Sequence, residues 1–345
     1  MKTKPGEKSL VLNALRRSTM TAIGAVLVAM VLLASVLSPY FLDQYNLQSL
    51  IRDLAFIGMI GIAQSLLLLI GELDLSVGKM ASLCGIIAGM LMVHQGVNPV
   101  LSMIIALALG MMLGALNGTI ITRLRLNSMV ATIGMQGVYG GINLVLTKGK
   151  AVTGIPESIL FLGKGNLGPI PIPFIFTLIV LVCILFLTKK TKTGRYIYAI
   201  GNSKEAAKIL GIKVDRIRVL IYSVVGLISA LAGILYVARL GSSQSAIGEN
   251  WPMNSIASSV IGGVALTGGI GNPAGALIGA AIISVIQNMI VLLGVNVYWQ
   301  SAVSGFVVVI AISFSSISGM MREKKQRSIK VAKVAATAAE TEKNG

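Results

Sequence analysis

Runs of about 20 apolar residues recur from one end of this chain to the other. A run of that length is what an α-helix needs to cross the hydrocarbon core of a bilayer. Hydrophobic residues make up 55% of the 345 residues and charged residues 12%, whereas a soluble domain carries about 25% charged residues. The sequence therefore predicts an all-α, polytopic membrane protein.

We expect ten membrane-spanning segments, at residues 20–38, 54–70, 77–93, 99–122, 129–147, 170–188, 219–240, 255–268, 274–293 and 299–319. Segments 77–93 and 255–268 are rich in Gly and Ser and barely reach across a bilayer. Such segments are typical of broken or re-entrant helices, whose free backbone groups other parts of the protein must satisfy. We interpret the first segment as a retained helix, because no clear cleavage site of small residues follows it.

The chain is expected to form one membrane domain. No polar stretch exceeds roughly 30 residues, far below the size of a separate soluble domain. We therefore expect a basic N-terminal tail over 1–19, a transmembrane domain over 20–320 with a long polar loop at 189–218, and a C-terminal tail over 321–345. The composition of that tail predicts a disordered or weakly helical segment near the membrane surface.

Charge sets the predicted orientation. The formal net charge is +17, with 29 Lys and Arg residues that gather in the two tails and in the loop 189–218. Cytoplasmic segments of membrane proteins carry such an excess, so both termini are expected in the cytoplasm. Lys79 counts as cytoplasmic in this arrangement, and the basic residues left outside are Arg52, Lys148, Lys150, Lys164 and Arg239. This location explains the charge better than nucleic-acid binding does.

Glycines recur at four-residue spacing within the predicted helices, as pairs and as triplets. They are Gly85 and Gly89, Gly137 and Gly141, Gly110, Gly114 and Gly118, and Gly271, Gly275 and Gly279. This spacing puts glycine on one face of a helix and lets neighbouring backbones approach closely. We interpret the glycines as helix-packing residues and not as ligand contacts.

The loop 189–218 contains the signature of a short helix. Asn202 is followed three residues later by Glu205, which is the form of a capping box. Gly211 then stands where a helix would stop. The predicted helix, roughly 203–210, carries Ala206, Ala207, Ile209 and Leu210. A helix this short is marginal alone in water, so it should dock either on its own membrane domain or on a cytosolic partner.

The polar residues expected deep in the membrane are neutral, whereas the acidic residues Asp53, Glu72 and Asp74 fall at segment ends. A proton or ion relay usually keeps a carboxylate or histidine at depth. The neutral set suits a hydroxylated solute, or else serves only hydrogen bonding between helices. Its members are Gln64, Ser65, Asn117, Thr132, Gln136, Asn143, Ser258, Ser259, Gln287 and Asn288.

The sharpest motif of the first half is GELDLSVG at 71–78. Asp74 or Ser76 could cap the helix that follows, because an acceptor is favourable at the positive end of a helix. Alternatively, these residues and Glu72 shape a re-entrant turn beside a transport path. The motif alone does not choose between the two interpretations.

Several chemistries lack the residues they need. No GxxxxGK[ST] phosphate loop occurs, so ATP is not bound by that route. With His94 the only histidine and Cys84 and Cys183 in apolar segments, neither a His/Cys metal cluster nor a disulfide framework is predicted. No Ser/His/Asp or Cys/His arrangement is available for catalysis. We expect a protein that is not an enzyme and needs no cofactor of its own.

Five blocks, in order, resemble the membrane-spanning permeases of ribose-type ABC sugar importers. GELDLSVG at 71–78 is similar to the GGIDLSVG signature of that family, and NSMVATIG at 127–134 resembles the block after its fourth span. GNSKEAAKILGI at 201–212 fits the EAA-x3-G loop pattern of ABC permeases. Residues 262–281 and 287–300 resemble the C-terminal blocks. The resemblance runs from about Asn46 to Phe314.

The resemblance implies the ABC importer permease fold and a role for the short helix. In such permeases this is the coupling helix, which fits a groove of the ATPase subunit. Glu205, Ala206, Ala207 and Gly211 would make that contact, with Asn202 as the cap. The expected partners are an ABC ATPase subunit, a second permease chain, a periplasmic or lipid-anchored solute-binding protein and membrane lipid. The expected location is the bacterial inner membrane, and no nucleic acid is expected.

The chain departs from the family pattern at positions that bear on the solute. Glu72 stands where Gly is usual, Leu73 stands where Ile is common, and Met253-Asn254-Ser255 replaces a stretch that is often acidic. Related permeases carry polyols, inositols, furanosyl signalling molecules or nucleosides as well as sugars. The sequence names neither the solute nor whether the second permease is an identical copy.

Two other functions compete with an importer permease. A secondary carrier coupled to ions would need an ion or proton site at depth. A channel or scaffold would leave the capped helix without a task. The blocks of family resemblance favour the ATP-driven importer of a ribose-like or related monosaccharide, working by alternating access.

Overall fold

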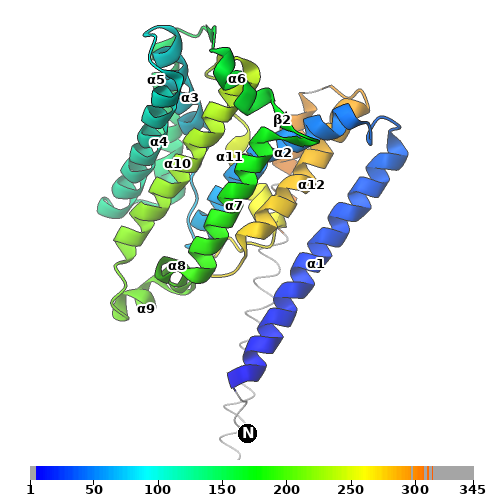
Figure 1. Cartoon of the computed structure of the whole chain (residues 1–345). Helices are drawn as coiled ribbons and strands as arrows, with labels where there is room; N and C mark the ends of the chain where they lie inside the picture. Colours follow the sequence, from blue (N-terminus) through cyan, green and yellow to red (C-terminus); the bar gives the residue numbers. More distant parts are fainter. Residues whose placement is uncertain (1–4, 297, 307–308, 311–312, 314–345) are drawn as a thin grey trace, which may run out of the picture.

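The structure, a computed structural model, describes residues 5–296, 298–306, 309–310 and 313, with side chains from residue 20 on. Helices make up nearly all of the regular structure and run mostly up and down between two ends (Figure 1). We call them the α9 end, where the short helices α8 and α9 lie at the bottom of Figure 1, and the α6 end, at the top. The predicted tail over 321–345 lies outside the described residues.

The first half of the chain contributes six helices and one short strand. They are α1 (Pro5–Leu37), α2 (Gln44–Leu69), α3 (Val77–Val93), α4 (Pro99–Arg123), α5 (Ser128–Thr147), β1 (Val152–Thr153) and α6 (Glu157–Lys164).

The second half continues through the long basic loop, which is itself helical. Its elements are β2 (Asn166–Leu167), β3 (Ile170–Pro171), α7 (Ile172–Lys190), α8 (Lys192–Asn202), α9 (Lys204–Ile209), α10 (Val214–Leu240), β4 (Ser242–Ser243), α11 (Trp251–Ile261) and α12 (Pro273–Leu292). Residues 299–306 are helical as well.

Local sequence signals determine where several of the long helices begin and end. α4 and α12 both begin after an Asn-Pro pair, in which the Asn98 or Asn272 side chain accepts hydrogen bonds from backbone amides of the first turn. Proline suits the first helical position, because the amide it lacks would have no partner there. α10 ends at Gly241, which adopts a left-handed φ of 72° that costs glycine little.

Each predicted segment overlaps a helix at least in part, and among the described residues seven helices of at least 18 residues are apolar enough to cross a membrane. α3 has 17 residues and α11 only 11. The predicted boundaries 255–268 were wrong: α11 starts earlier and ends at Ile261, because glycines with positive φ follow it at 263, 268, 269 and 271. The predicted segment 299–319 lies largely outside the described residues.

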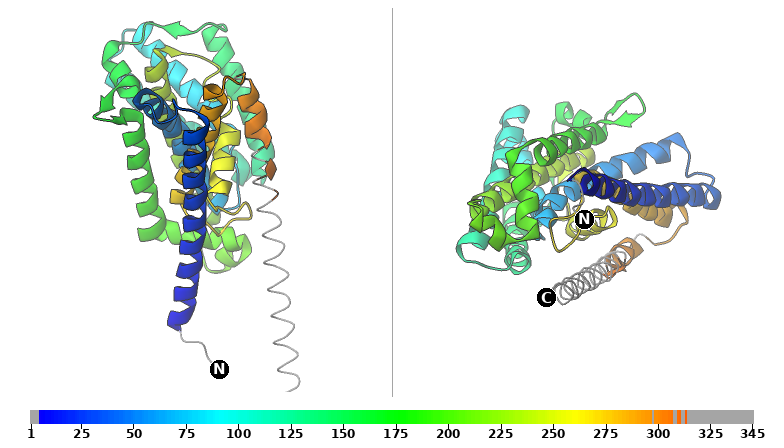
Figure 2. Two further views of the ribbon diagram at one scale, coloured as in Figure 1. Left: turned by 90° about the vertical axis from the view of Figure 1, so that its right-hand side faces the viewer. Right: turned by 90° about the horizontal axis from the view of Figure 1, so that it is seen from below.

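α2 and α10 form the centre of the bundle, and α1 stands apart from it. In the most apolar stretch of each helix, 83% of α2 is buried but only 6% of α1. α1 packs chiefly on α12. Figure 1 shows it at the edge of the bundle, and in the left view of Figure 2, taken from that side, it lies in front of the other helices. Its exposed apolar side chains therefore face lipid.

Glycines bring α4 and α10 into backbone contact. A side chain added at Gly114 would collide with the Tyr222 carbonyl, and one at Gly226 with the Gly110 carbonyl. Gly275 and Gly279 pack against α11 in the same way. By contrast, no atom of the described residues lies within 4 Å of a Cβ added at Gly137 or Gly141 of α5. The helix-packing interpretation thus holds inside the chain for α4 and α12, but α5 leaves its pair open.

Two short antiparallel strand pairs cover the α6 end. β1 pairs with β4, with Val152 opposite Ser243, and β2 pairs with β3, with Asn166 opposite Pro171. The β1–β4 pair ties the loop after α5 to the loop after α10. Beneath it, Phe56, Tyr236 and Trp251 pack their rings together, and the Arg239 guanidinium lies over two of them.

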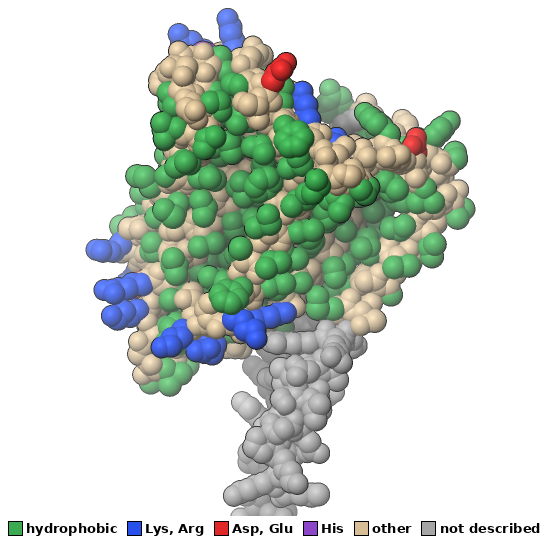
Figure 3. Space-filling model, viewed as in Figure 1, with side chains coloured by type: hydrophobic (Ala, Val, Ile, Leu, Met, Phe, Trp, Pro, Cys, Tyr) green, Lys and Arg blue, Asp and Glu red, His purple; other side chains and the backbone are tan. Residues whose placement is uncertain are grey.

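Charge and hydrophobicity divide the surface into bands. On the face shown in Figure 3, an apolar belt separates two groups of Lys and Arg side chains. The group at the α9 end contains exposed residues of three elements and their loops: Arg123, Arg125, Lys189, Lys190, Lys192 and Arg195. This banding is that of a protein crossing a bilayer.

We expect Gly114→Leu to destabilise the bundle, because the added side chain has no room between α4 and α10. Overpacking of this kind costs about 1–3 kcal/mol. The thermal midpoint of the purified protein in mild detergent measures the effect. Gly24→Leu in α1, where nothing lies within 4 Å, is the matched control and should leave the midpoint unchanged. Equal midpoints for both variants would contradict the packing assignment.

Candidate functional site

The predicted short helix exists as α9, but its cap is not Asn202. Asn202 is the last residue of α8, where its side-chain amide donates to the Tyr198 carbonyl at 2.7 Å. Ser203 is the N-cap instead, because its hydroxyl accepts from the Ala206 amide at 3.1 Å and donates to the Glu205 carboxylate at 3.3 Å. The cap is therefore one residue later than predicted, since α8 extends further than the loop sequence suggested, and Glu205 falls at the second position of α9 instead of the third, which a capping box requires.

The end of α9 follows the prediction. Gly211 adopts φ 77°, its amide donates to the Lys208 carbonyl at 2.9 Å, and the Ile212 amide donates to the Ala207 carbonyl at 3.0 Å. This pair of bonds is the Schellman motif, which favours glycine at the left-handed position. Capped at both ends, a helix of six residues is held in place despite its length.

α9 presents most of its surface to solvent. Ala207 is buried against the membrane domain, whereas Ile209 and Leu210 are 86% and 77% exposed. Glu205, Ala206 and Gly211 are exposed as well. Beside the helix is an open hollow of about 340 Å³, which is lined by Lys208, Ile212, Lys213, Val214, Asp215 and Arg216.

Glu72 joins α9 to the transmembrane helices. Its side chain is 2% exposed, and one carboxylate oxygen, Oε1, accepts from Lys204 Nζ at 2.9 Å and from Arg218 Nε at 2.6 Å. Lys204 begins α9 and Arg218 lies in the second turn of α10. Glu72 therefore lies at the α9 end, in an ion-pair cluster, and its place beside a transport path stays a prediction.

The linker that carries Glu72 enters the bundle without being helical. The Leu73 amide donates to Ser128 Oγ at 3.3 Å, and the Leu75 amide donates to Thr132 Oγ1 at 3.1 Å, one turn further along α5. The linker thus climbs beside α5 before α3 starts at Val77. This crossing consists of an extended entry and a short helix, as the broken-segment interpretation expected.

Asp74 lies at the segment end before α3, as predicted, but it is also the centre of a buried polar cluster. Its carboxylate accepts from the Ser76 amide at 2.7 Å, from Ser76 Oγ at 2.6 Å and from Asn117 Nδ2 at 3.2 Å. Tyr139 donates to Asn117 Oδ1 at 2.7 Å. Asn117 lies six residues before the end of α4, about 9 Å into the bundle at 1.5 Å per residue. α3 begins inside the bundle, so its N-terminal carboxylate is at depth.

A second non-helical segment, between β4 and α11, lies along the face of α3. Ser82 Oγ donates to the Gln244 carbonyl at 2.9 Å, Lys79 Nζ to the Ser245 carbonyl at 3.2 Å, and Ser243 Oγ to the Gly85 carbonyl at 3.0 Å. Lys79 was counted with the cytoplasmic charges, and that was wrong. It points to the segment that follows the far end of α10, so it lies within the bundle.

The remaining predicted residues do not join the Asp74 cluster. Asn143 donates to the Lys79 carbonyl at 3.2 Å, so it lies near the cluster on α5. Asn288 pairs with Asn46, with amide contacts of 2.7 and 3.1 Å, which hold α12 to α2. Gln64 is fully buried in α2 with no hydrogen-bond partner among the described residues. Gln136 is half-buried on α5.

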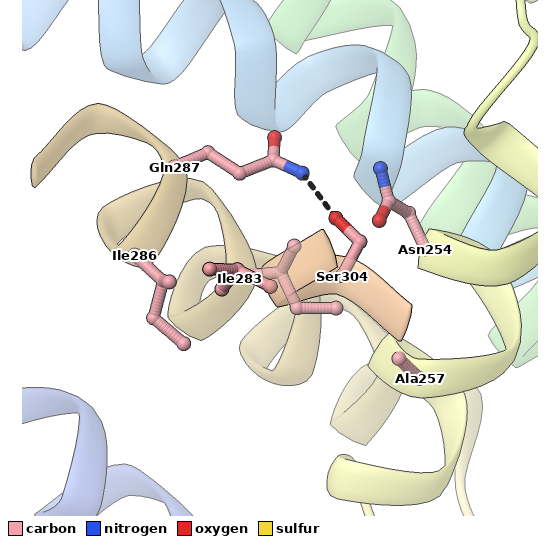
Figure 4. Close-up of a pocket in the computed structure, with 7 residues that line it drawn as sticks. Asn254, Ala257, Ile283, Ile286, Gln287 and Ser304 are labelled. Atoms are coloured by element: carbon pink, nitrogen blue, oxygen red, sulfur yellow. Dashed lines mark hydrogen bonds between the residues drawn. The ribbon is translucent and has the colours of Figure 1, made fainter. Parts of the chain in front are cut away.

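A small cavity, lined mainly by apolar surface, lies between α11, α12 and the helical residues 299–306 (Figure 4). Gln287 Nε2 donates to Ser304 Oγ at 3.3 Å, and Asn254 and Ile283 also line the space. Its volume of about 10 Å³ is the room of about one water molecule. A binding site for a small organic molecule usually offers about 300 Å³ or more, so this cavity is not the solute site.

Sequence reasoning missed the partners that make these clusters. Lys204 and Arg218 were treated as members of a basic loop, although their common partner is 132 and 146 residues away. Tyr139 was not singled out. A buried acidic residue at a helix start was the one available signal, because such a residue needs donors.

Comparison with known proteins identifies the chain. The protein family described as "Branched-chain amino acid transport system / permease component" matches residues 46–312, which is most of the chain. The chain belongs to this family. It is therefore a multi-pass membrane permease, a transport protein rather than an enzyme, and the crossings and the non-helical entries described above belong to a transporter.

Curated relatives cover nearly the same region. The permease is 40% identical over 286 residues to the ribose import permease protein RbsC of Bacillus subtilis, which spans 82% of this chain and 88% of the relative. It is 35% identical to the protein of that name from Escherichia coli K12, over 83% of this chain and 90% of the relative. It is 33% identical to the autoinducer 2 import system permease protein LsrC of Yersinia enterocolitica, over 90% of this chain and 86% of the relative. No solved structure matches the chain.

We expect Asp74→Ala to destabilise the permease, because it leaves the donors of Ser76 and Asn117 buried without an acceptor. A stranded buried donor costs about 1–3 kcal/mol. Asp43→Ala is the matched control, since Asp43 accepts the Tyr45 amide in the same way but is exposed. A lower thermal midpoint for Asp74→Ala than for Asp43→Ala is the expected result, and the reverse order would contradict the assignment.

Proposed function

We propose that this permease is the membrane subunit of an ATP-driven importer that moves a ribose-like or related monosaccharide into the bacterial cytoplasm. The observation that carries the proposal is α9, a helix capped at both ends that exposes Ile209 and Leu210 outside the apolar belt. Relatives at 40% and 35% identity are ribose import permeases, which supports a sugar as the solute.

In this proposal α9 is the coupling helix, and its exposed face binds an ABC ATPase subunit. The chain has no phosphate loop of its own, so the energy has to come from a partner. Glu205 and Ala206 face solvent beside the apolar pair, while the buried Ala207 fixes α9 to the membrane domain. Movement of the ATPase subunits would thereby be passed to the transmembrane helices and drive alternating access. Solute would arrive on a periplasmic or lipid-anchored binding protein at the α6 end.

The orientation follows from this assignment. The α9 end carries the dense group of exposed basic residues and would face the cytoplasm of a bacterium, with the inner membrane at the apolar belt. Both termini would then be cytoplasmic. Anionic lipid would contact the basic residues at the edge of the belt.

A second permease chain would pack on α5. Gly137 and Gly141 lie on an exposed face with Val138 and Val145, and no part of the chain that the structure describes fills the space above the two glycines. The same spacing on α4 is filled by α10. In a membrane the hydrophobic effect does not drive helices together, so their association depends on close packing. Small residues at this spacing allow that packing.

One observation favours a second candidate, an ion-coupled carrier. Asp74 is a fully buried carboxylate inside the bundle, and such groups mark ion and proton pathways. In this carrier the Asp74 cluster would bind the coupling ion, and α9 would have no energetic role. Uptake that collapses with an uncoupler at constant ATP is the result that this candidate requires.

We expect Leu210→Glu to abolish uptake of labelled ribose in cells and to weaken ATPase binding at least about tenfold, as the loss of a well-packed apolar contact does. Leu167→Glu in β2 is the matched control, because Leu167 is also exposed, at 70%, but lies at the α6 end. The control should bind the ATPase subunit normally. Normal ATPase binding and uptake by Leu210→Glu, with uptake sensitive to uncoupler, would replace the importer by the carrier.

Gly137→Leu should separate the two permease chains without unfolding either. The added side chain would stand on the open face of α5, where it prevents close helix contact. Native mass spectrometry of the complex from mild detergent reports the number of permease chains. Gly24→Leu on α1 provides the same change on a lipid-facing helix and should keep two copies. Two copies in the Gly137→Leu complex would rule out α5 as the interface.

A further inference from the structure

The ion pairs of Glu72 connect three parts of the permease that are far apart in sequence. Lys204 belongs to α9, Arg218 to α10, and Glu72 to the non-helical linker before α3. Both cations share the oxygen Oε1, and the carboxylate is nearly inaccessible to solvent. Arg218 is largely buried as well, with 13% of its side chain exposed, whereas Lys204 is 38% exposed. Separating the cations from the buried carboxylate leaves its charge uncompensated. Movement of α9 away from the linker therefore acts on Glu72 through Lys204.

We propose that Glu72 is the positioning residue through which movement of α9 is passed to the linker 72–76 and so to the Asp74 cluster. The inference rests on the proposed function, because it takes α9 as the element that the ATPase subunit moves. It adds the route by which that movement enters the membrane domain. The route runs through the side chain of a single residue of the linker and not through the helix α10 alone.

Successive residues of the linker hold different helices. Glu72 binds α9 and α10, the Leu73 carbonyl accepts from Tyr222 Oη of α10 at 3.2 Å, and Asp74 binds Asn117 of α4. An extended chain advances about 3.3 Å per residue, so Glu72 and Asp74 are only about 7 Å apart along it. A displacement of Glu72 is thus delivered directly to the start of α3. The linker is too short to absorb such a displacement as a long flexible loop would.

The carboxylate also has room for a second arrangement. Oε2 is buried with no hydrogen-bond partner among the described residues. Arg218 presents Nε to Oε1, while its Nη1 lies 3.5 Å from Asp215. A guanidinium can bind a carboxylate through two parallel bonds, so a turn of Arg218 away from Asp215 would engage both oxygens. The Glu72–Arg218 pair can therefore rearrange without breaking, whereas the link from Glu72 to α9 is made by Lys204.

Hydrogen–deuterium exchange of the intact complex tests the route without knowledge of the solute. The permease is purified with its ATPase subunit in nanodiscs and compared with and without ATP plus vanadate. The amides of Leu73, Leu75 and Ser76 report on the linker, because each is held by a side-chain acceptor. The amides of residues 204–212 report on α9. In the native complex we expect the nucleotide to change exchange in both segments.

In Glu72→Gln, Lys204→Met and Arg218→Met complexes, we expect α9 to respond to nucleotide while the response of the linker is lost. In the double variant Glu72→Gln with Lys204→Met, the response of the linker should be reduced no further than in either single variant. Both single changes already remove the same ion pair, Lys204–Glu72. Lys192→Met and Arg195→Met in α8, exposed basic residues of the same loop, are the matched controls and should retain both responses. Thermal midpoints identify any variant that is merely unfolded.

A linker that still responds to nucleotide in a folded Glu72→Gln complex would overturn the inference. A native complex in which α9 itself shows no response, or in which no ATPase subunit binds, would overturn the proposed function and this inference with it. The two failures are distinguishable, since the first is seen only in the variants and the second already in the native complex.

Discussion

Backbone inside a membrane has no water to bond to, and this permease has two stretches of non-helical backbone inside its bundle. The backbone amides and carbonyls of these stretches need hydrogen-bond partners from elsewhere in the protein. Ser128 and Thr132 serve the amides of the first stretch, and Ser82 and Lys79 serve the carbonyls of the second. The hydroxyl and amine groups at depth are therefore consequences of the broken crossings. α3 lies between both stretches, so its position depends on these bonds.

Because of this dependence, the start of α3 is in contact with several distant parts of the chain. The linker touches α9 through Glu72 and α4 through Asp74, while the segment before α11 lies against the next turns of α3. Long helices such as α4 and α10, locked by glycines in backbone contact, can only move as rigid bodies. Motion between such bodies has to be absorbed where the chain is not helical, which is the usual site of hinges.

The architecture was largely predictable, because hydrophobic length alone fixes where crossings occur. The end of α9 was predictable too, since only glycine tolerates the φ of 77° at Gly211 at no cost. The site was less so. The sequence placed Asp74 and Glu72 at segment ends, but their depth and partners follow from α3 starting inside the bundle, which no local pattern records. The predictions for Lys79 and for the cap of α9 were wrong for a related reason. Both depend on where a helix starts or ends, at Val77 for α3 and at Asn202 for α8.

The isolated position of α1 has a consequence for how the protein is made. α1 is synthesised well before α12, which is its principal contact among the described residues. At about 5–20 residues per second, α1 waits on the order of tens of seconds in lipid before its neighbour exists. Its face for α12 must be stable in lipid during that interval, which its almost wholly apolar surface over residues 20–37 allows. α1 is thus inserted early and packs late, onto the outer face of a bundle that is otherwise formed.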